Sequence, residues 1–261
     1  MLAWLGGAWW RPHAAGAAVA AFLLALITVQ VIGHGPVTAV DAPVHAYFDP
    51  REPEGALHAL AVAGARLGQR AVTIPLLAAA AVWASLRWRD PRPIVATVTG
   101  LGALALVGTV LKVYVGRTPP VLDVDVVNAG IDNVTAWLTS LATFGATPFD
   151  GFVSYPSGHT ANAALTFPLL AWLLFGPYGV RPGAVALRRA LLCSLVPVVL
   201  VGSMMVVLDY HWVSEVLGGA ALGAALALLS RLVLGSGTAR GTEAVARAAP
   251  ASPVRVPRKS G

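Results

Sequence analysis

Apolar residues occur in long stretches along the chain, separated by short segments that hold most of the charged side chains. A helix needs about 20 mostly apolar residues to cross a bilayer. Six stretches qualify, at 14–33, 69–86, 93–111, 160–176, 187–208 and 213–234. The stretch Ala56–Gly68 is shorter and contains Arg66, so we expect an interfacial helix there. The pattern predicts an all-α fold, a six-span transmembrane helical bundle.

The composition agrees with a membrane protein and excludes other classes. Hydrophobic residues make up 57% of the 261 positions and charged residues only 11%, whereas a soluble domain carries roughly 25% charged residues. The net charge of +6 would make nucleic acid a candidate partner for a soluble protein. Here the basic residues flank the apolar stretches and no nucleic-acid motif accompanies them. We therefore exclude nucleic acid and expect the lipid bilayer as the partner.

The distribution of Lys and Arg predicts the orientation of the bundle. Six spans place both termini on one side, and that side holds thirteen of the 18 basic residues, against five on the other. Basic residues accumulate on the cytoplasmic side of membrane proteins. We therefore expect a multi-pass protein of the plasma membrane, with cytoplasmic termini and with the loop Val121–Tyr155 outside the cytoplasm.

Three regions are predicted: an interfacial amino-terminal segment at 1–13, the membrane domain at 14–234, and a disordered basic cytoplasmic tail at 235–261. The first apolar stretch resembles a signal peptide, but its length of about 20 residues favours a retained span. The single cysteine, Cys193, excludes an internal disulfide and is expected to be a buried apolar side chain. Interfacial anchors are expected at Trp4, Trp9 and Trp10.

Three clusters of polar residues stand at the ends of predicted spans. Lys112–Pro120 (KVYVGRTPP) ends the third span, Tyr155–Thr160 (YPSGHT) opens the fourth, and Asp209–Glu215 (DYHWVSE) joins the fifth to the sixth. The predicted topology places all three at the extracytoplasmic surface. Residues that are distant in the sequence are therefore expected to meet in one site.

Each cluster taken alone has a purely structural interpretation. Lys112 and Arg117 would extend to lipid head groups, Ser157 would cap a helix, and His211 with its neighbouring tryptophan would anchor the chain at the interface. Together the clusters hold two histidines, two cations, a helix-start serine and a carboxylate four residues after a histidine. That combination on one face favours a shared site.

These residue types fit phosphoryl transfer through histidine. A phosphate ester needs cationic and N–H donors around its oxygens, an in-line nucleophile, and a proton for the leaving alcohol. One neutral histidine can attack phosphorus while the other, protonated, serves the leaving oxygen. Glu215 can fix the tautomer of His211 four residues earlier. The candidate donors are Lys112, Arg117 and the N–H groups of Ser157, Gly158 and His159 at a helix start.

The segments and their order resemble the type 2 phosphatidic acid phosphatase family of six-span lipid phosphatases and related soluble acid phosphatases. Its pattern is Lys, six residues, Arg-Pro; then Pro-Ser-Gly-His; then Ser-Arg, five residues, His, three residues, Asp. The second motif is complete at 156–159, and the resemblance spans roughly 14–234. It implies a helical bundle without metal or cofactor, with His211 as nucleophile and His159 as general acid. It also implies a phosphate pocket that includes Lys112, Ser157 and Gly158.

The chain departs from this pattern at four positions. Pro119 stands where the first motif has its arginine, which leaves Arg117 as the nearby cation. The Ser-Arg pair is replaced by Met204 and Met205, and the final aspartate by Glu215. A charged hydrogen bond to phosphate contributes about 1.5–3 kcal/mol. The loss of two guanidinium positions therefore predicts weaker phosphate binding unless another cation compensates.

The leading hypothesis is an integral membrane lipid phosphatase that hydrolyses a phosphomonoester or diphosphate of a lipid through a phosphohistidine intermediate. Polyprenyl phosphate and phosphatidate are the substrate types considered. A lipid phosphotransferase and a degenerate member that binds lipid phosphate without catalysis are the alternatives. A transporter is disfavoured because no paired broken spans are visible. The loop Val121–Tyr155 is expected to shape head-group selectivity, and solvent exposure is expected for its carboxylates, Asp123, Asp125 and Asp132.

Overall fold

The computed structural model describes residues 10–142, 153–176 and 184–235. Within these ranges the chain is helical, and the only β-pairing is one antiparallel bridge between Arg117 and Val127. The all-α fold class is therefore confirmed. The helices are α1 (Trp10–Ile32), η1 (Pro36–Val40), α2 (Asp41–Phe48), η2 (Asp49–Arg51), α3 (Gly55–Arg66), α4 (Arg70–Trp88), α5 (Arg92–Val115), η3 (Pro120–Leu122), α6 (Ile131–Ala142), α7 (Gly158–Phe175), α8 (Ala184–Cys193), α9 (Leu195–Val207) and α10 (Val213–Gly235).

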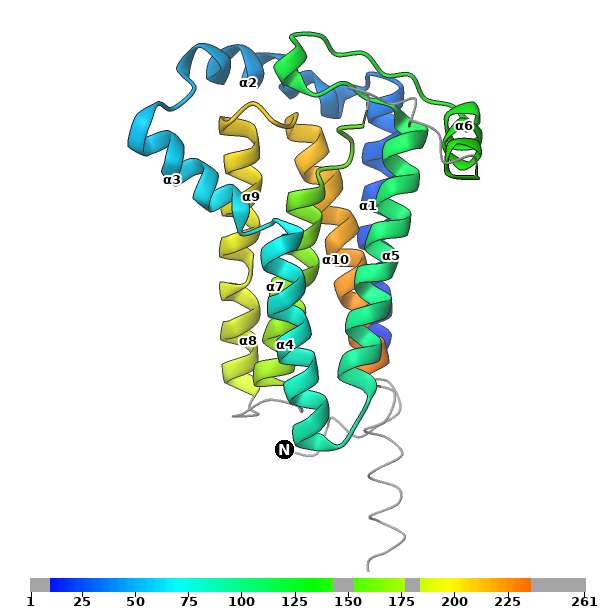
Figure 1. Ribbon diagram of the computed structural model, residues 1–261, viewed down its shortest axis with the longest axis vertical. Helices are drawn as coiled ribbons and strands as arrows, with labels where there is room; N and C mark the ends of the chain where they lie inside the picture. Colours follow the sequence, from blue (N-terminus) through cyan, green and yellow to red (C-terminus); the bar gives the residue numbers. More distant parts are fainter. Residues whose placement is uncertain (1–9, 143–152, 177–183, 236–261) are drawn as a thin grey trace, which may run out of the picture.

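The long helices run side by side and form the bundle seen in Figure 1. Five segments are long and apolar enough to cross a membrane: α1, α4, α5, α10, and the α8–α9 pair over Val185–Val207. The sixth predicted span corresponds to α7, which packs against α4, α9 and α10. The first turns of α7 contain polar residues, including His159 and Asn162, and the rest of the helix is mainly apolar. These polar residues belong to the site described below.

The α8–α9 pair corresponds to one predicted span with a break near its middle. Pro197 has no backbone N–H, so the carbonyl of Cys193 lacks its usual partner four residues later. The helix accordingly ends at Cys193 and resumes at Leu195. Proline is a common cause of such interruptions in otherwise continuous helices.

α7 lies at the centre of the packing. Its residues Leu165, Leu169 and Leu173 are fully buried, and they form one apolar cluster with Leu77 of α4 and Leu222 of α10. Helices in a bilayer associate through such close packing, because lipid tails are as apolar as the side chains. The cluster fixes the position of α7 relative to α4 and α10.

Glycines of α10 allow its backbone to approach α7 closely. A Cβ atom at Gly219 would collide with the carbonyl oxygen of Ser157, and one at Gly223 with the carbonyl oxygen of Ala161. The two glycines are four residues apart and therefore lie on one face of the helix. This contact holds the start of α7 beside the start of α10, where two of the three polar clusters lie.

Short helices cover one end of the bundle (Figure 1). The predicted interfacial helix at 56–68 is present as α3, which runs obliquely past that end. The sequence pattern gave no indication of α2, nor of α6 inside the loop Val121–Tyr155. Helices of 8 and 12 residues are marginal in isolation and depend on packing with the rest of the protein.

Two predictions about the flanks and the cysteine need revision. Trp10 to His13 form the first turn of α1 and are not a separate segment, while Trp4, Trp9 and the tail at 236–261 lie outside the described residues. Cys193 is exposed on the bundle surface, contrary to the expectation of burial.

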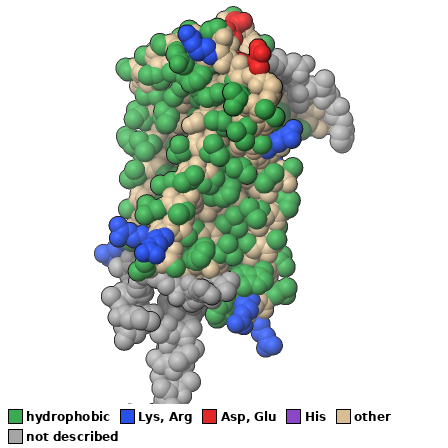
Figure 2. All heavy atoms as spheres, turned by 90° about the vertical axis from the view of Figure 1, so that its left-hand side faces the viewer, with side chains coloured by type: hydrophobic (Ala, Val, Ile, Leu, Met, Phe, Trp, Pro, Cys, Tyr) green, Lys and Arg blue, Asp and Glu red, His purple; other side chains and the backbone are tan. Residues whose placement is uncertain are grey.

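In Figure 2 hydrophobic side chains cover the bundle wall and charged ones lie mostly toward its ends. A bilayer accommodates exposed apolar residues of this kind.

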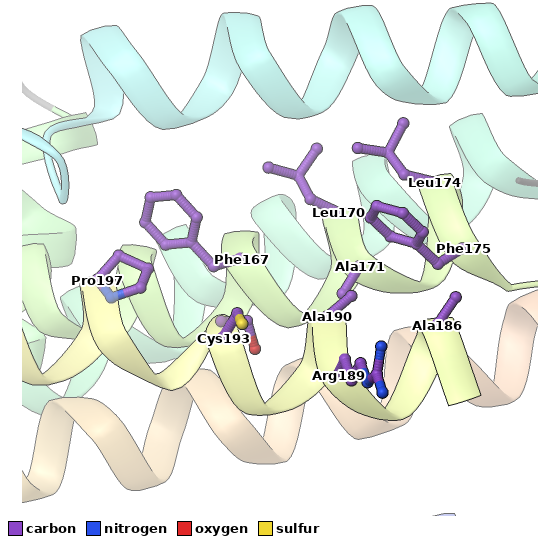
Figure 3. Close-up of a pocket in the computed structure, with 11 residues that line it drawn as sticks. Phe167, Leu170, Ala171, Leu174, Phe175, Ala186, Arg189, Ala190, Cys193 and Pro197 are labelled. Atoms are coloured by element: carbon purple, nitrogen blue, oxygen red, sulfur yellow. The ribbon is translucent and has the colours of Figure 1, made fainter. Parts of the chain in front are cut away.

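An apolar groove of about 550 Å³ lies between α7, α8 and α9 (Figure 3). Its wall includes Phe167, Leu170 and Phe175 of α7, with Arg189 and Cys193 of α8. No histidine or carboxylate lines it among the residues that the structure describes. The groove therefore lacks the groups that phosphoryl transfer needs, although it is larger than the recess at the candidate site.

Candidate active site

The structure brings the three polar clusters together toward the end of the bundle at which α2 and α3 lie (Figure 1). Lys112 lies in the last turn of α5, His159 in the first turn of α7, and His211 just before α10. His159 is near enough to His211 and Lys112 to interact with their charges. The backbone N–H of Ser157 donates to the carbonyl of Glu215 at 3.0 Å, which ties the second cluster to the third.

Glu215 contacts His211 as the sequence predicted. Its Oε2 lies 2.7 Å from Nδ1 of His211, and the carboxylate is fully buried while the imidazole is 12% exposed. An ionised carboxylate accepts a hydrogen bond, so this contact places the ring proton on Nδ1 and leaves Nε2 with a lone pair. The other oxygen, Oε1, accepts a short hydrogen bond from the Ser154 hydroxyl. Both carboxylate oxygens are therefore fixed.

Arg117 is fully buried and binds protein groups. Its Nε and Nη2 donate to the two oxygens of Asp125, both at 2.8 Å, and Nη2 also donates to Asp41 at 2.8 Å. Nη1 donates to the hydroxyl of Ser214 at 2.7 Å, and the guanidinium lies over the ring of Trp212, 5.2 Å from its centre. These bonds engage four of its five N–H groups.

Electrostatics favour the charged state of Arg117 at this position. Burial lowers the pKa of Arg117, but its hydrogen bonds to Asp125 and Asp41 and the charge of Glu215 more than offset this effect, so the pKa is raised. Asp125 is exposed, as expected for a loop carboxylate, and both of its oxygens also accept hydrogen bonds from Arg117. Asp132 is exposed, as expected.

Asp41 is a site residue that the sequence interpretation missed. Its Oδ1 accepts the backbone N–H of Ser214 at 2.9 Å, and its Oδ2 accepts the Ser214 hydroxyl at 2.5 Å as well as Arg117. It is 2% exposed although it lies in the first turn of the short helix α2. Asp41 and Arg117 together hold the start of α10 and hence Glu215.

Lys112 and Ser157 shape the approach to the two histidines. The Nζ of Lys112 donates to the carbonyls of Val153 and Ser154 at 2.7 and 2.9 Å, which leaves one ammonium N–H. Ser157 is the N-cap of α7, and its side chain accepts the N–H of Thr160 at 3.5 Å. No described group accepts the N–H of Gly158 or His159. Together with the positive end of the helix dipole, these two donors at a helix start are suited to bind an anion.

Apolar packing and a turn occupy the positions where the family pattern has arginine. Met205 is 1% exposed and packs in a cluster with Ala61 and Ala65 of α3. Pro119 precedes the short helix η3. Neither position places a charge near the histidines.

A second histidine–carboxylate pair lies beside the site. Nδ1 of His45 is 2.8 Å from Asp209, its Nε2 is 3.4 Å from Asp123, and its ring packs edge-on against Trp212. Burial lowers the pKa of His45, but the hydrogen bond and charge of Asp209 outweigh it and raise the pKa. The pair links α2 to the segment that carries His211. Among the described residues no group of three or more His, Cys, Asp or Glu could hold a metal ion.

Comparisons with known proteins agree with this arrangement. The family model of the PAP2 superfamily matches residues 93–236, more than half of the chain. No significant match was found among curated proteins. Among solved structures, the chain is similar to a crystal structure described as the first transmembrane PAP2-type phosphatidylglycerolphosphate phosphatase from Bacillus subtilis.

That structural match has a TM-score of 0.63 at 21% sequence identity, and it covers 83% of this chain and 94% of the other. The similarity therefore concerns the fold of a transmembrane bundle. The matched family region runs from the start of α5 to the end of α10 and contains all three polar clusters. Given the apolar spans, the convergent clusters and the family match, the chain is an integral membrane protein that belongs to the PAP2 superfamily.

Proposed function

We propose that the chain is a membrane lipid phosphatase that hydrolyses a phosphomonoester or diphosphate of a lipid through a phosphohistidine on His211. The observation that carries the proposal is the buried contact between Glu215 and Nδ1 of His211, with His159 and Lys112 close by. That contact orients Nε2 as a nucleophile and stabilises the cation that forms on the ring as phosphorus bonds to it.

Two steps follow from these roles. In the first, Nε2 of His211 attacks phosphorus, the bond from phosphorus to the lipid oxygen breaks, and protonated His159 gives its proton to that oxygen. In the second, neutral His159 takes a proton from water, the water oxygen attacks phosphorus, and the P–N bond breaks. Inorganic phosphate leaves, and both histidines return to their starting states.

Phosphate binding is assigned to Lys112, Ser157 and Gly158, and to the helix-start N–H of His159. Arg117 was predicted to bind phosphate as well. Because four of its N–H groups bond to Asp41, Asp125 and Ser214, we assign it instead to positioning the start of α10. Arginine usually binds phosphate through two parallel N–H···O hydrogen bonds, and Arg117 has only one N–H group left to donate.

The substrate class follows from the bilayer setting. A site at the end of a membrane bundle, close to apolar walls, suits a phosphate group on a lipid that arrives laterally. The similar solved protein is described as a phosphatidylglycerolphosphate phosphatase, so that lipid joins phosphatidate and polyprenyl phosphates in the panel to be tested. Phosphate release from each lipid by purified protein, with His211→Ala as control, is the direct test.

The results also separate the alternatives. Phosphate release that requires His211 supports a phosphatase. Transfer of the phosphoryl group to added alcohol without phosphate release supports a phosphotransferase. Lipid-phosphate binding with no turnover supports a non-catalytic member, an outcome that the missing arginines at positions 119 and 205 favour.

We further propose that the site faces outward in the plasma membrane and that both termini are cytoplasmic, because thirteen of 18 basic residues lie on the side of the termini. Gly130 precedes α6 at the site end, and a Cβ there meets no crowded neighbour. Gly130→Cys in a Cys193→Ser background should react with an impermeant maleimide in intact cells. Labelling only after permeabilisation contradicts the orientation.

A further inference from the structure

A small recess lies directly beside the candidate site, and its lining includes residues from outside the three motifs. Its wall combines Lys112, Ser157 and Gly158 of the proposed phosphate pocket with Arg70 of α4 and Asn162 of α7. The recess lies between the starts of α4 and α7 and the facing sides of α5 and α10. Arg70 belongs to none of the three motifs.

The turn between α3 and α4 explains how Arg70 reaches the site. A Cβ atom at Gly68 would collide with the carbonyl of His159, so the backbone of the turn packs directly on the first turn of α7. α4 then begins at Arg70, where the carbonyl of Gln69 accepts the N–H groups of Val72 and Thr73 at 2.9 Å. Arg70 is therefore only two residues away from Gly68, whose backbone contacts His159, the proposed general acid.

The charges around Arg70 leave it available for an anion. Its charge acts on Lys112, so two cations face one recess. Within the described parts of the chain, no carboxylate lies within ion-pair distance of Arg70, and no carbonyl accepts a hydrogen bond from its guanidinium. By contrast, four of the five N–H groups of Arg117 donate hydrogen bonds to protein groups. Glu215 also acts on Lys112, but its oxygens bind His211 and Ser154.

Asn162 supplies an independent sign of a ligand in the recess. It lies four residues after Gly158, on the same face of α7. Only 6% of Asn162 is exposed, yet its amide has no hydrogen-bond partner among the described residues although it lines the recess. An amide offers both a donor and an acceptor, so this side chain is suited to bind a group that enters the recess.

We propose that Arg70 is a phosphate-binding residue of this active site and that, with Asn162, it grips the phosphoryl oxygens of the substrate. Arg70 then supplies from α4 the guanidinium that the chain lacks at Pro119 and Met205. The inference rests on the proposed function and adds to it a ligand from outside the three motifs. It also predicts preference for a phosphate dianion or diphosphate over a singly charged diester, because two cations face the group.

Kinetics of matched variants test this role. Arg70→Gln should lower kcat/KM for the best lipid phosphate by roughly 10- to 100-fold, the range expected for one charged hydrogen-bonding group. Arg70→Lys should recover only part of the loss, because an ammonium lacks the bidentate fork. Arg66→Gln is the control: Arg66 is an exposed arginine in the last turn of α3 and does not line the recess, so it should match the unmodified protein.

A binding measurement keeps the test independent of turnover. Orthovanadate and inorganic phosphate should raise the melting temperature of the purified protein, and Arg70→Gln should weaken each apparent Kd by roughly tenfold or more. His211→Ala retains Arg70 and should still bind inorganic phosphate.

The outcomes distinguish the two proposals. Turnover that depends on His211 but is unchanged in Arg70→Gln, with unchanged vanadate affinity, overturns the role of Arg70 and leaves the phosphatase proposal standing. Phosphate and vanadate binding that depends on Arg70, without turnover of any lipid in the panel, supports the anion site and overturns the phosphatase proposal.

Discussion

Glu215→Gln changes one oxygen to an amide nitrogen at the centre of the site. The carboxylate is fully buried, lies 2.7 Å from Nδ1 of His211, and is 3.9 Å from Nε of Arg117. The substitution keeps the size of the side chain and removes its charge. It therefore isolates the electrostatic and tautomeric role of the carboxylate from its packing.

Two effects set the magnitude for Glu215→Gln. Loss of the negative charge beside the imidazolium formed during phosphorylation should cost more than about 1.4 kcal/mol of transition-state stabilisation, a rate loss above about tenfold. If the new amide donates to Nδ1, the ring proton moves to Nε2 and the nucleophilic lone pair is lost. In a serine protease the corresponding change lowers kcat by roughly 10⁴, which sets the upper end of the expected range.

The assay is single-turnover phosphate release at saturating lipid, with thermal stability measured on the same preparation. Glu215→Gln should fold, bind lipid phosphate and turn over at least tenfold more slowly. Glu215→Asp restores the residue of the family pattern and keeps the charge, so it should retain more activity than the amide variant. Near-normal turnover in Glu215→Gln would remove the carboxylate from the mechanism and leave it a buried structural group.

Three further substitutions have definite expected outcomes. Asp41→Ala leaves a buried guanidinium short of one acceptor and should destabilise the protein by about 3 kcal/mol; an unchanged melting temperature would contradict the role of Asp41 in holding Arg117 and the start of α10. The raised pKa of His45 means that its bond to Asp209 contributes stability fully below the ordinary pKa of about 6.5 and loses it as pH rises through the raised value. Melting temperatures between pH 6 and 9 should therefore fall more steeply in the unmodified protein than in His45→Gln, and parallel curves would refute this. Gly223→Ala should destabilise the α7–α10 contact by about 1–3 kcal/mol, whereas Gly102→Ala, where a Cβ meets nothing within 4 Å, should not.

The sequence predicted the bundle well because membrane spans are encoded locally. A run of about 20 apolar residues identifies a span whatever it packs against, and the Pro-Ser-Gly-His segment marks the start of α7 by its own residue types. The contact between Glu215 and His211 also follows from short spacing. In each case the information lies within a few residues of the feature.

The polar network around Arg117 was not predictable in the same way. Asp41 and Asp125 reach Arg117 across separations of 76 and 8 residues, and nothing around either aspartate distinguishes it from a solvated loop residue. A buried guanidinium is stabilised by carboxylate partners, so the side chain of Arg117 is oriented toward Asp41 and Asp125. Arg70 was overlooked for a related reason: its position depends on the backbone contact between Gly68 and His159.

The most direct test of the central claim is trapping of the covalent intermediate. Purified protein is mixed with lipid carrying radiolabelled phosphate, quenched within one turnover, and digested to locate the label. The account predicts an alkali-stable, acid-labile phosphoryl group on His211, absent in His211→Ala and accumulating in His159→Ala when the lipid has a good leaving group. Phosphate release without any labelled protein, or a label on another residue, would contradict His211 as the nucleophile.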